Sequence, residues 1–239
     1  MTRAKSPIVA TLTLAALPGF AGSSFAGEVE IDASRSIIAV VTHKGGVAAS
    51  QAHNHLAVAA DYRVRLTFDP ERPLAAGFEL ELASEDLEID DWTIQQAWYP
   101  RLEKLGILDE PFSELADKTR AKIRAAMLGD GQLDSAAFPT LAARVAGISE
   151  EPSTVAGVEL PYAVTLALEV RGETVEKKAA ARYELTDDRL TIEAVGAFRF
   201  TDFGIKPYSA AFGLVKNLDE FHLYLHLEGR LPDGRPPTD

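Results

Sequence analysis

Three histidines are the residues whose type and spacing best suit metal chemistry. His53 and His55 are two positions apart, so in an extended segment their side chains point to the same side, and His43 precedes them. Neutral imidazoles in such a set suit zinc, copper or iron. However, no glutamate follows His55 at the spacing of a cupin metal site. The sequence leaves open a metal-binding protein or metal-dependent enzyme using His43, His53 and His55, but favours a polar rim or hydrogen-bonded loop.

Other catalytic chemistry has little support in the sequence. There is no Gly-x-Ser-x-Gly elbow, no glycine-rich phosphate loop and no cysteine nucleophile. Arg199 and Asp202 resemble a catalytic pair, but a structural role at a strand end is favoured. The adjacent acids Asp90 and Asp91 would point to opposite faces of a strand, and turns are their usual place. We therefore expect no enzymatic activity and no cofactor.

The overall charge restricts the partners. The chain of 239 residues has a formal net charge of −12, and residues 1–26 contain two cations and no acid, which leaves −14 for the remainder. Such a surface repels phosphate backbones and anionic bilayer faces, so we expect no nucleic-acid partner. A neutral hydrophobic small molecule meets no such objection. Without cysteine, neither a disulfide nor a lipid-modified cysteine can form.

The first 26 residues have the pattern of a secretory signal peptide. Arg3 and Lys5 form the positive start, residues 7–17 are a short apolar run, and Ser24-Phe25-Ala26 is a small-x-small cleavage signal. The apolar run is shorter than the ~20 residues that span a bilayer. We expect a periplasmic or secreted protein with a cleaved signal peptide and no stable membrane insertion.

The elements that would position a binding site are strands with alternating apolar residues. In the clearest of them, 193–200, one face carries Ala194, Gly196, Phe198 and Phe200. Similar strands are expected at 29–32, 37–43, 62–68, 78–82, 141–148, 158–170, 174–184 and 221–227. The last has leucines on one side and His222, Tyr224 and His226 on the other, which we expect to be exposed or at a rim. About eight strands at regular spacing predict a sandwich or closed barrel.

Residues 91–129 depart from the strand pattern. Pro111, an apolar period from Phe112 to Met127 and a final Gly129 predict an amphipathic helix, and residues 92–105 predict a shorter helix interrupted at Pro100. This helical insertion either packs on the barrel or forms a lid over a cavity mouth. We expect one domain over residues 27–229 and a disordered tail over 230–239.

Several of these segments carry a resemblance to a known family. Residues 198–205, Phe-Arg-Phe-Thr-Asp-Phe-Gly-Ile, resemble the strand-end signature of the YceI-like family of exported lipid-binding proteins. Ile31-Asp32 with Ser36, residues 133–140 and residues 168–175 are similar to other landmarks of that family, in the same order. The longer helical insertion and His53-Asn54-His55 depart from its pattern.

The resemblance implies a single antiparallel, lipocalin-like β-barrel whose apolar lumen holds a long isoprenoid or fatty chain. It also implies a non-enzymatic, periplasmic or secreted protein and is compatible with a homodimer. Small inward residues would leave room for such a chain, although they also suit a solid core. The candidate lining residues are Leu80, Leu166, Leu168, Phe198, Phe200, Phe221 and Leu223, with Trp92, Trp98 and Phe112 at the mouth.

Overall fold

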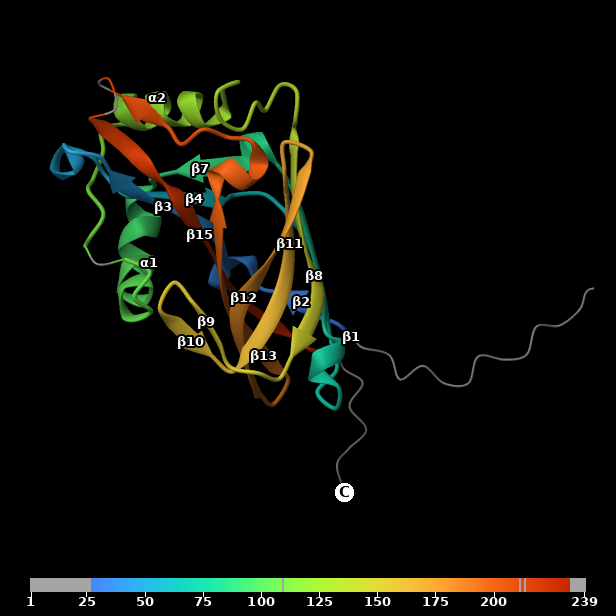
Figure 1. Ribbon diagram of the computed structural model, residues 1–239. Coiled ribbons are helices and arrows are strands. Elements are labelled where there is room, and N and C mark those ends of the chain that lie inside the picture. The colour runs from blue at the N-terminus through green and yellow to red at the C-terminus, as the bar shows by residue number, and fades with distance from the viewer. Residues whose placement is uncertain (1–26, 109, 211, 213, 233–239) are drawn as a thin grey trace, which may run out of the picture.

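The structure is a computed structural model that describes residues 27–108, 110–210, 212 and 214–232, and about half of these residues are in β-strands (Figure 1). Two α-helices, α1 (Trp92–Lys104) and α2 (Asp117–Leu128), interrupt the strands. The strands are β1 (Gly27–Glu28), β2 (Glu30–Ile31), β3 (Ile37–Gly45), β4 (His55–Ala59), β5 (Arg63–Phe68), β6 (Gly77–Ala83), β7 (Leu87–Ile89), β8 (Thr140–Ser149), β9 (Ser153–Val155), β10 (Val158–Leu160), β11 (Tyr162–Val170), β12 (Glu173–Thr186), β13 (Arg189–Arg199), β14 (Ser209–Ala210) and β15 (Val215–Arg230).

One antiparallel sheet contains all of these strands except β9 and β10, which form a separate hairpin. The hydrogen-bonded order is β1-β5-β6-β8-β11-β12-β13-β15-β3-β4-β7, and β2 and β14 add to β15. The sheet curls into a half-barrel (Figure 1). The predicted mainly β, lipocalin-like fold is thereby confirmed.

The concave face of the sheet holds the inner core. On β6, Phe78, Leu80 and Leu82 are buried while Glu79 and Glu81 are exposed, which is the alternation that a half-buried strand requires. The inward residues of β5, β8, β11, β13 and β15 join the same cluster. The inward face predicted for β13 is confirmed, because Ala194 and Phe198 belong to this core.

A second core covers the convex face, where the sequence led us to expect a wet surface. Helix α1, residues 105–108, Phe112 and the β9–β10 hairpin pack there on β3, β4, β12, β13 and β15. His222, Tyr224 and His226 are therefore buried beneath this layer, and their predicted exposure is wrong. The sequence suggested a solvent-exposed face on β15 because His222, Tyr224 and His226 all have polar groups, although the outer layer covers them.

The same two-sided burial explains why β4 was missed in the sequence. Its residues His55-Leu-Ala-Val-Ala59 are almost all buried, because one face meets the inner core and the other the outer core. A strand buried on both faces has no alternation of apolar and polar residues. The helical insertion also differs from expectation: α1 continues through Pro100, and α2 begins at Asp117 rather than near Phe112.

The turn after β13 has the structural role that we favoured for Asp202. A 3₁₀ turn (Phe200–Phe203) ends at Gly204, whose φ of 67° lies in the left-handed region that favours glycine. The Asp202 carboxylate accepts from the backbone N–H of Arg199 at 3.1 Å and pairs with Lys177 at 2.9 Å. These contacts close the strand end.

The two ends of the predicted domain differ in what the structure describes. The proposed signal peptide, residues 1–26, lies outside the described residues. At the other end β15 extends to Arg230, and the N–H of Leu231 donates to the Asp188 carbonyl at 2.8 Å. Residues 230 and 231 therefore belong to the fold, while 233–239 are not described. No described helix has the length and apolar character needed to cross a membrane.

Candidate functional site: an apolar cavity inside the barrel

A large apolar space lies between the concave face of the sheet and α2. Its volume is about 250 Å³, and we call it the main cavity. Strands β3, β4, β6, β7, β8, β11 and β15 supply its wall. Its apolar wall is formed by residues including Ile38, Val40, Ala57, Ala59, Leu80, Leu82, Leu87, Ile89, Leu141, Ala143, Leu168, Val170, Phe200, Phe203, Ile205, Phe221 and Leu223.

A second void, of about 90 Å³, lies next to the main cavity along the barrel and shares none of its lining residues. On two strands, neighbouring inward residues line different spaces. On β11, Leu166 lines the second void and Leu168 lines the main cavity; on β15, Leu225 lines the second void and Leu223 lines the main cavity. Along β11 the lining runs from Val164 to Val170, which spans ~20 Å at ~3.3 Å per residue. The interior is therefore elongated, and it suits a chain better than a compact molecule.

Helix α2 covers the main cavity with its apolar side. Ile123, Ala126 and Met127 line the cavity at helical spacing, but no residue of α2 is fully buried. Arg120 reaches the β7–α1 turn, with 3.7 Å between its guanidinium and the Asp91 carboxylate, and Arg124 donates to the Glu85 carbonyl. The helix is thus held by two arginines over an incompletely filled interior.

One region of the cavity wall is polar. His55 and Thr42 lie opposite each other on β4 and β3, and both line the main cavity. The His55 Nδ1 is 2.7 Å from the Asp90 carboxylate, which leaves Nε2 as the ring atom that a ligand can engage. The Thr42 hydroxyl is buried without a hydrogen-bond partner. Lys122 of α2 also reaches the cavity lining.

Asp90 holds this polar region in place. Its buried carboxylate accepts from the Leu56 N–H at 3.0 Å and from the Gln95 amide at 2.9 Å, in addition to the His55 contact. Asp90 has a φ of 53°, a left-handed conformation, at the junction between β7 and α1. A buried carboxylate without hydrogen-bond donors would be strongly destabilising, so these three bonds hold the Asp90 side chain in place. The fixed carboxylate in turn orients the imidazole of His55.

The structure places most of the predicted lining residues around the interior. Five of them line the main cavity and Leu166 lines the second void. Phe198 faces inward but is packed against Phe221, with ring centroids 6.0 Å apart, and the Cβ of a residue at Gly196 would approach its ring to 3.0 Å. Gly196 therefore makes room for Phe198. The five residues in the main cavity are Leu80, Leu168, Phe200, Phe221 and Leu223.

The three residues predicted at the mouth lie elsewhere. Trp92, Trp98 and Phe112 belong to the outer core, on the convex side of the sheet. Trp98 packs edge-on against Tyr224, with centroids 6.2 Å apart. Their placement at the mouth is wrong because α1 lies against the outside of the barrel, and α2 takes the position at the cavity. The helical stripe of Ile123, Ala126 and Met127 was the signal that could have identified these lining residues.

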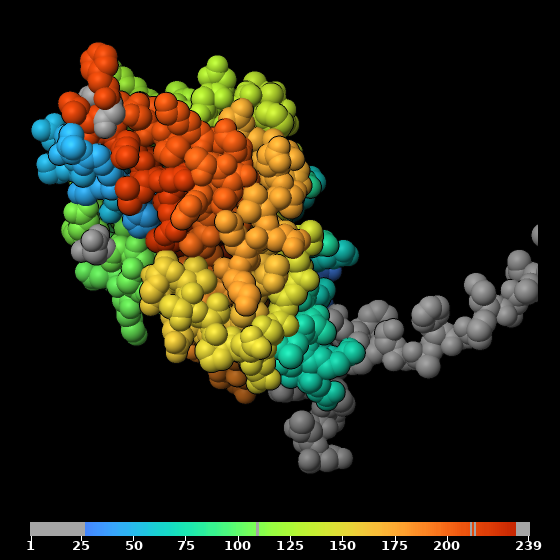
Figure 2. Space-filling model, in the orientation of Figure 1, coloured from blue at the N-terminus to red at the C-terminus, as the bar shows by residue number. Residues whose placement is uncertain are grey.

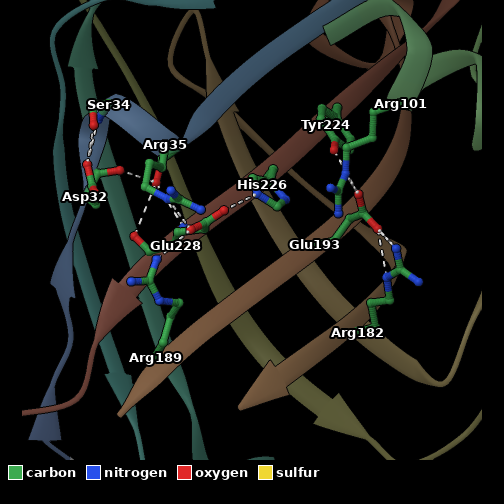
Figure 3. A network of polar contacts seen from close by, with 11 residues as sticks. Asp32, Ser34, Arg35, Arg101, Arg182, Arg189, Glu193, Tyr224, His226 and Glu228 are labelled. Atoms are coloured by element: carbon green, nitrogen blue, oxygen red, sulfur yellow. Dashed lines mark hydrogen bonds and ion pairs between the residues drawn. The ribbon is translucent and has the colours of Figure 1, made fainter. Parts of the chain in front are cut away.

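A buried carboxylate joins α1 to the sheet (Figure 3). Glu193 of β13 accepts from Arg101 of α1 at 2.5 Å and from the Tyr224 hydroxyl at 2.8 Å, and Arg182 approaches its other oxygen at 2.5 Å. Burial alone would raise the pKa of Glu193, but the hydrogen bonds from Arg101 and Tyr224 outweigh it and hold that pKa below its usual range. We infer that the network has a structural role, since Glu193, Arg101 and Tyr224 line neither cavity and only Arg182 reaches the second void.

The metal alternative does not fit the positions of its histidines. The His43 Nε2 contacts the His222 Nδ1 at 2.9 Å on the convex side, whereas His55 faces the main cavity. Adjacent positions on a strand point to opposite faces, and His55 is paired with Thr42, the residue before His43. Within the described part of the chain, no cluster of three or more His, Cys, Asp or Glu side chains could hold a metal ion.

Comparison with known proteins finds a similar fold without a similar sequence. No family model matches the chain, and neither does any curated protein. Among solved structures, BcnA of Burkholderia cenocepacia has a TM-score of 0.56 at 13% identity, over 84% of this chain and 99% of BcnA. This likeness shows a shared fold.

Two further solved structures are more distant. A YCEI protein of Campylobacter jejuni has a TM-score of 0.47 at 10% identity, over 74% of this chain and 85% of that chain. A polyisoprenoid binding domain of Saccharophagus degradans also has a TM-score of 0.47, at 11% identity, over 87% of this chain and the whole of that domain.

Proposed function

We propose that this protein is a non-enzymatic binding protein that holds one long hydrophobic chain, isoprenoid or fatty-acid-like, in its interior. The observation that carries the proposal is the main cavity, which is apolar and is covered by a helix that has no fully buried residue. Burial of apolar surface, at ~25 cal/mol per Å², would drive binding. The motif order resembling the YceI-like family supports the same ligand class.

The polar region of the cavity suggests how one end of the ligand is held. With Nδ1 bonded to Asp90, the imidazole of His55 presents Nε2 to the ligand as its remaining hydrogen-bonding atom, and the Thr42 hydroxyl can donate. A hydroxyl group on the ligand would satisfy both. We therefore propose an amphiphile, a long chain with a small hydrogen-bonding head near His55 and its tail directed toward the second void.

The location of the protein is part of the proposal. The signal-peptide pattern of residues 1–26 supports export to the periplasm or the exterior, and the absence of cysteine is compatible with an oxidising compartment. An exported carrier could sequester or move a chain that water does not dissolve.

Solvent extraction and native mass spectrometry of the purified protein test the proposed function. We expect one apolar chain per protein molecule. Ala143 of β8 lies inward between Leu80 and Leu168, so Ala143→Phe should fill the main cavity and abolish retention of the chain. Ala97→Phe adds the same ring to the exposed side of α1 and serves as the control. An empty wild-type protein that also fails to bind added chains would overturn the proposal.

A further inference from the structure

An unusual cluster of exposed apolar side chains lies near the cavity. Of the six large apolar residues that are exposed among the described residues, five lie on two segments, 44–52 and 206–218. These five are Val47, Tyr208, Phe212, Leu214 and Leu218, and we call them the apolar tip. The two segments are adjacent, since the Ala48 N–H donates to the Leu214 carbonyl at 2.9 Å. They project together at the upper left of the molecule (Figure 2).

Exposure of these apolar side chains to water is unfavourable, and burial within the fold does not offset it. Val47 is 88% exposed and Leu214 is 48% exposed. Clusters of this kind on a soluble surface commonly mark a site of interaction with a protein or a membrane. The sixth exposed residue, Leu74, lies between β5 and β6, away from the tip.

The charge around the apolar tip is opposite to that of the whole protein. Segments 44–52 and 206–218 contain three lysines and no acidic residue, in a chain whose net charge is −12. Lys44 pairs with Glu110 at 2.6 Å, whereas no ion pair connects Lys206 or Lys216 to another described residue. Lys206 and Lys216 therefore place positive charge beside the apolar tip, and the acidic Asp219 and Glu220 follow it directly in the sequence. Apolar residues flanked by lysines suit an anionic lipid surface.

The apolar tip is continuous with the wall of the main cavity. Tyr208 belongs to both, since it is exposed and also lines the cavity, and its backbone carbonyl accepts from the N–H of Asn217, another lining residue, at 2.9 Å. The Gln132 amide, which follows α2 and lines the cavity, donates to the Lys206 carbonyl at 3.0 Å. A chain leaving the cavity beside Tyr208 would meet the tip.

We propose that the apolar tip is a peripheral docking surface for an anionic lipid bilayer. Val47, Phe212 and Leu214 enter the interface, while Lys206 and Lys216 contact lipid phosphates. The biological role of this docking rests on the proposed function. Docking would bring the cavity next to a bilayer in which the long-chain ligand dissolves. The ligand could then pass between bilayer and cavity without crossing water. A second copy of this chain is the competing occupant of the tip.

Vesicle flotation tests the docking surface. The probe is a set of vesicles of phosphatidylcholine alone or of an equal mixture of phosphatidylcholine and phosphatidylglycerol. We expect the protein to float with the mixed vesicles and much less with the neutral ones, and binding to weaken as salt is raised. A protein that floats with neither, or equally with both, contradicts the proposal.

Surface variants locate the contact. The triple variant Val47→Ser, Phe212→Ser, Leu214→Ser should reduce binding to mixed vesicles by about tenfold or more, because three exposed apolar side chains leave the interface. Leu74→Ser is the matched control and should change nothing. Lys216→Glu should reduce binding by about tenfold, and Lys178→Glu, the same charge change on an exposed residue of β12, by much less.

Separate readouts keep the docking surface distinct from the proposed function. With a chain supplied in solution from cyclodextrin, the triple variant should bind as the wild type does, while its uptake of the chain from mixed vesicles should slow. If the wild type takes up no chain from either source, the proposed function fails, whatever the flotation result. If the triple variant instead converts a dimer into a monomer with unchanged flotation, the tip joins two copies of this chain and the docking proposal is overturned.

Discussion

The His55 Nδ1 lies 2.7 Å from a carboxylate oxygen of Asp90, and this contact links the cavity wall to the start of α1. Asp90 precedes Asp91, whose side chain accepts from the Ile94 N–H at 3.0 Å and caps that helix. The same short turn therefore orients a polar group toward the ligand space on one side and begins the outer layer on the other.

The first prediction concerns the ligand head. If Nε2 of His55 accepts a hydrogen bond from a ligand hydroxyl, a long-chain alcohol should bind more tightly than the alkane of equal length. His55→Phe should reduce that preference by about fivefold to tenfold, the value of one neutral hydrogen bond. Competition titrations of the two ligands measure it.

Thr42→Val is the companion change, because it removes the unpartnered hydroxyl and keeps the shape of the side chain. We expect it to weaken binding of the alcohol and leave that of the alkane unchanged. An unaltered preference in both variants would show that the head lies elsewhere.

The second prediction concerns ligand length. Ala181 of β12 lines the second void but not the main cavity. Ala181→Phe should therefore weaken binding of chains long enough to reach that void while leaving short chains unaffected, at a cost in stability of about 1–3 kcal/mol from overpacking. A series of alcohols of increasing length gives the comparison. Equal losses for short and long chains would mean that the two spaces do not hold one ligand.

The third prediction concerns the rate of exchange. Arg120 and Arg124 hold α2 against the β7 edge, so replacing both with alanine should loosen the helix over the cavity. We expect faster release of a fluorescent chain, with a smaller change in affinity, measured by stopped flow. Lys118→Ala on the same helix is the control. Unchanged release would indicate that ligands enter by a route that α2 does not cover.

The fourth prediction is a loss of stability in mild acid. Burial lowers the pKa of His226, and the nearby Arg101 lowers it further against the opposing effects of Glu228 and Glu193. Because the folded-state pKa lies below the ordinary 6.5, the unfolded chain takes up the proton first as the pH falls. The contribution of His226 to stability is therefore complete above pH 6.5 and declines below it. The loss is about 1.4 kcal/mol for each pH unit between the unfolded-state pKa and the lower folded-state pKa.

Urea unfolding from about pH 7 to about pH 5, the interval in which histidine titrates, measures this effect. His226→Gln should reduce the slope of this curve. His222 is also buried, and burial lowers its pKa as well. The stability of the His226→Gln variant should therefore still depend on pH, but less steeply. The same slope in His226→Gln as in the wild type would refute the assignment.

Period-two patterns predicted the inner wall well. Leu80, Leu168 and Leu223 alternate with polar or outward residues, and a strand with one dry face has few alternatives for the direction of its side chains. The signature from Phe198 to Ile205 located the turn that ends β13. Of the seven wall residues predicted, five line the main cavity and Leu166 lines the second void, whereas Phe198 is packed in the core and lines neither.

The outer layer could not be predicted in the same way. Nothing local in Trp92 or Trp98 says which side of the sheet α1 will cover, because that depends on the match between α1 and the convex residues of β13 and β15. Glu193 is the clearest case: in sequence it is an outward, charged residue, and only the approach of Arg101 and Tyr224 makes its burial stable. The partnership of His55 with Asp90 is likewise set by the pairing of β4 with β7.

The most direct measurement is photocrosslinking with a long-chain alcohol that carries a diazirine along its tail, followed by peptide mass spectrometry. The interior cavity predicts adducts on inward residues such as Leu80, Leu168 and Leu223, and their loss in Ala143→Phe. Adducts concentrated on α1 around Trp98, or adducts that persist in Ala143→Phe, would contradict a ligand site inside the barrel.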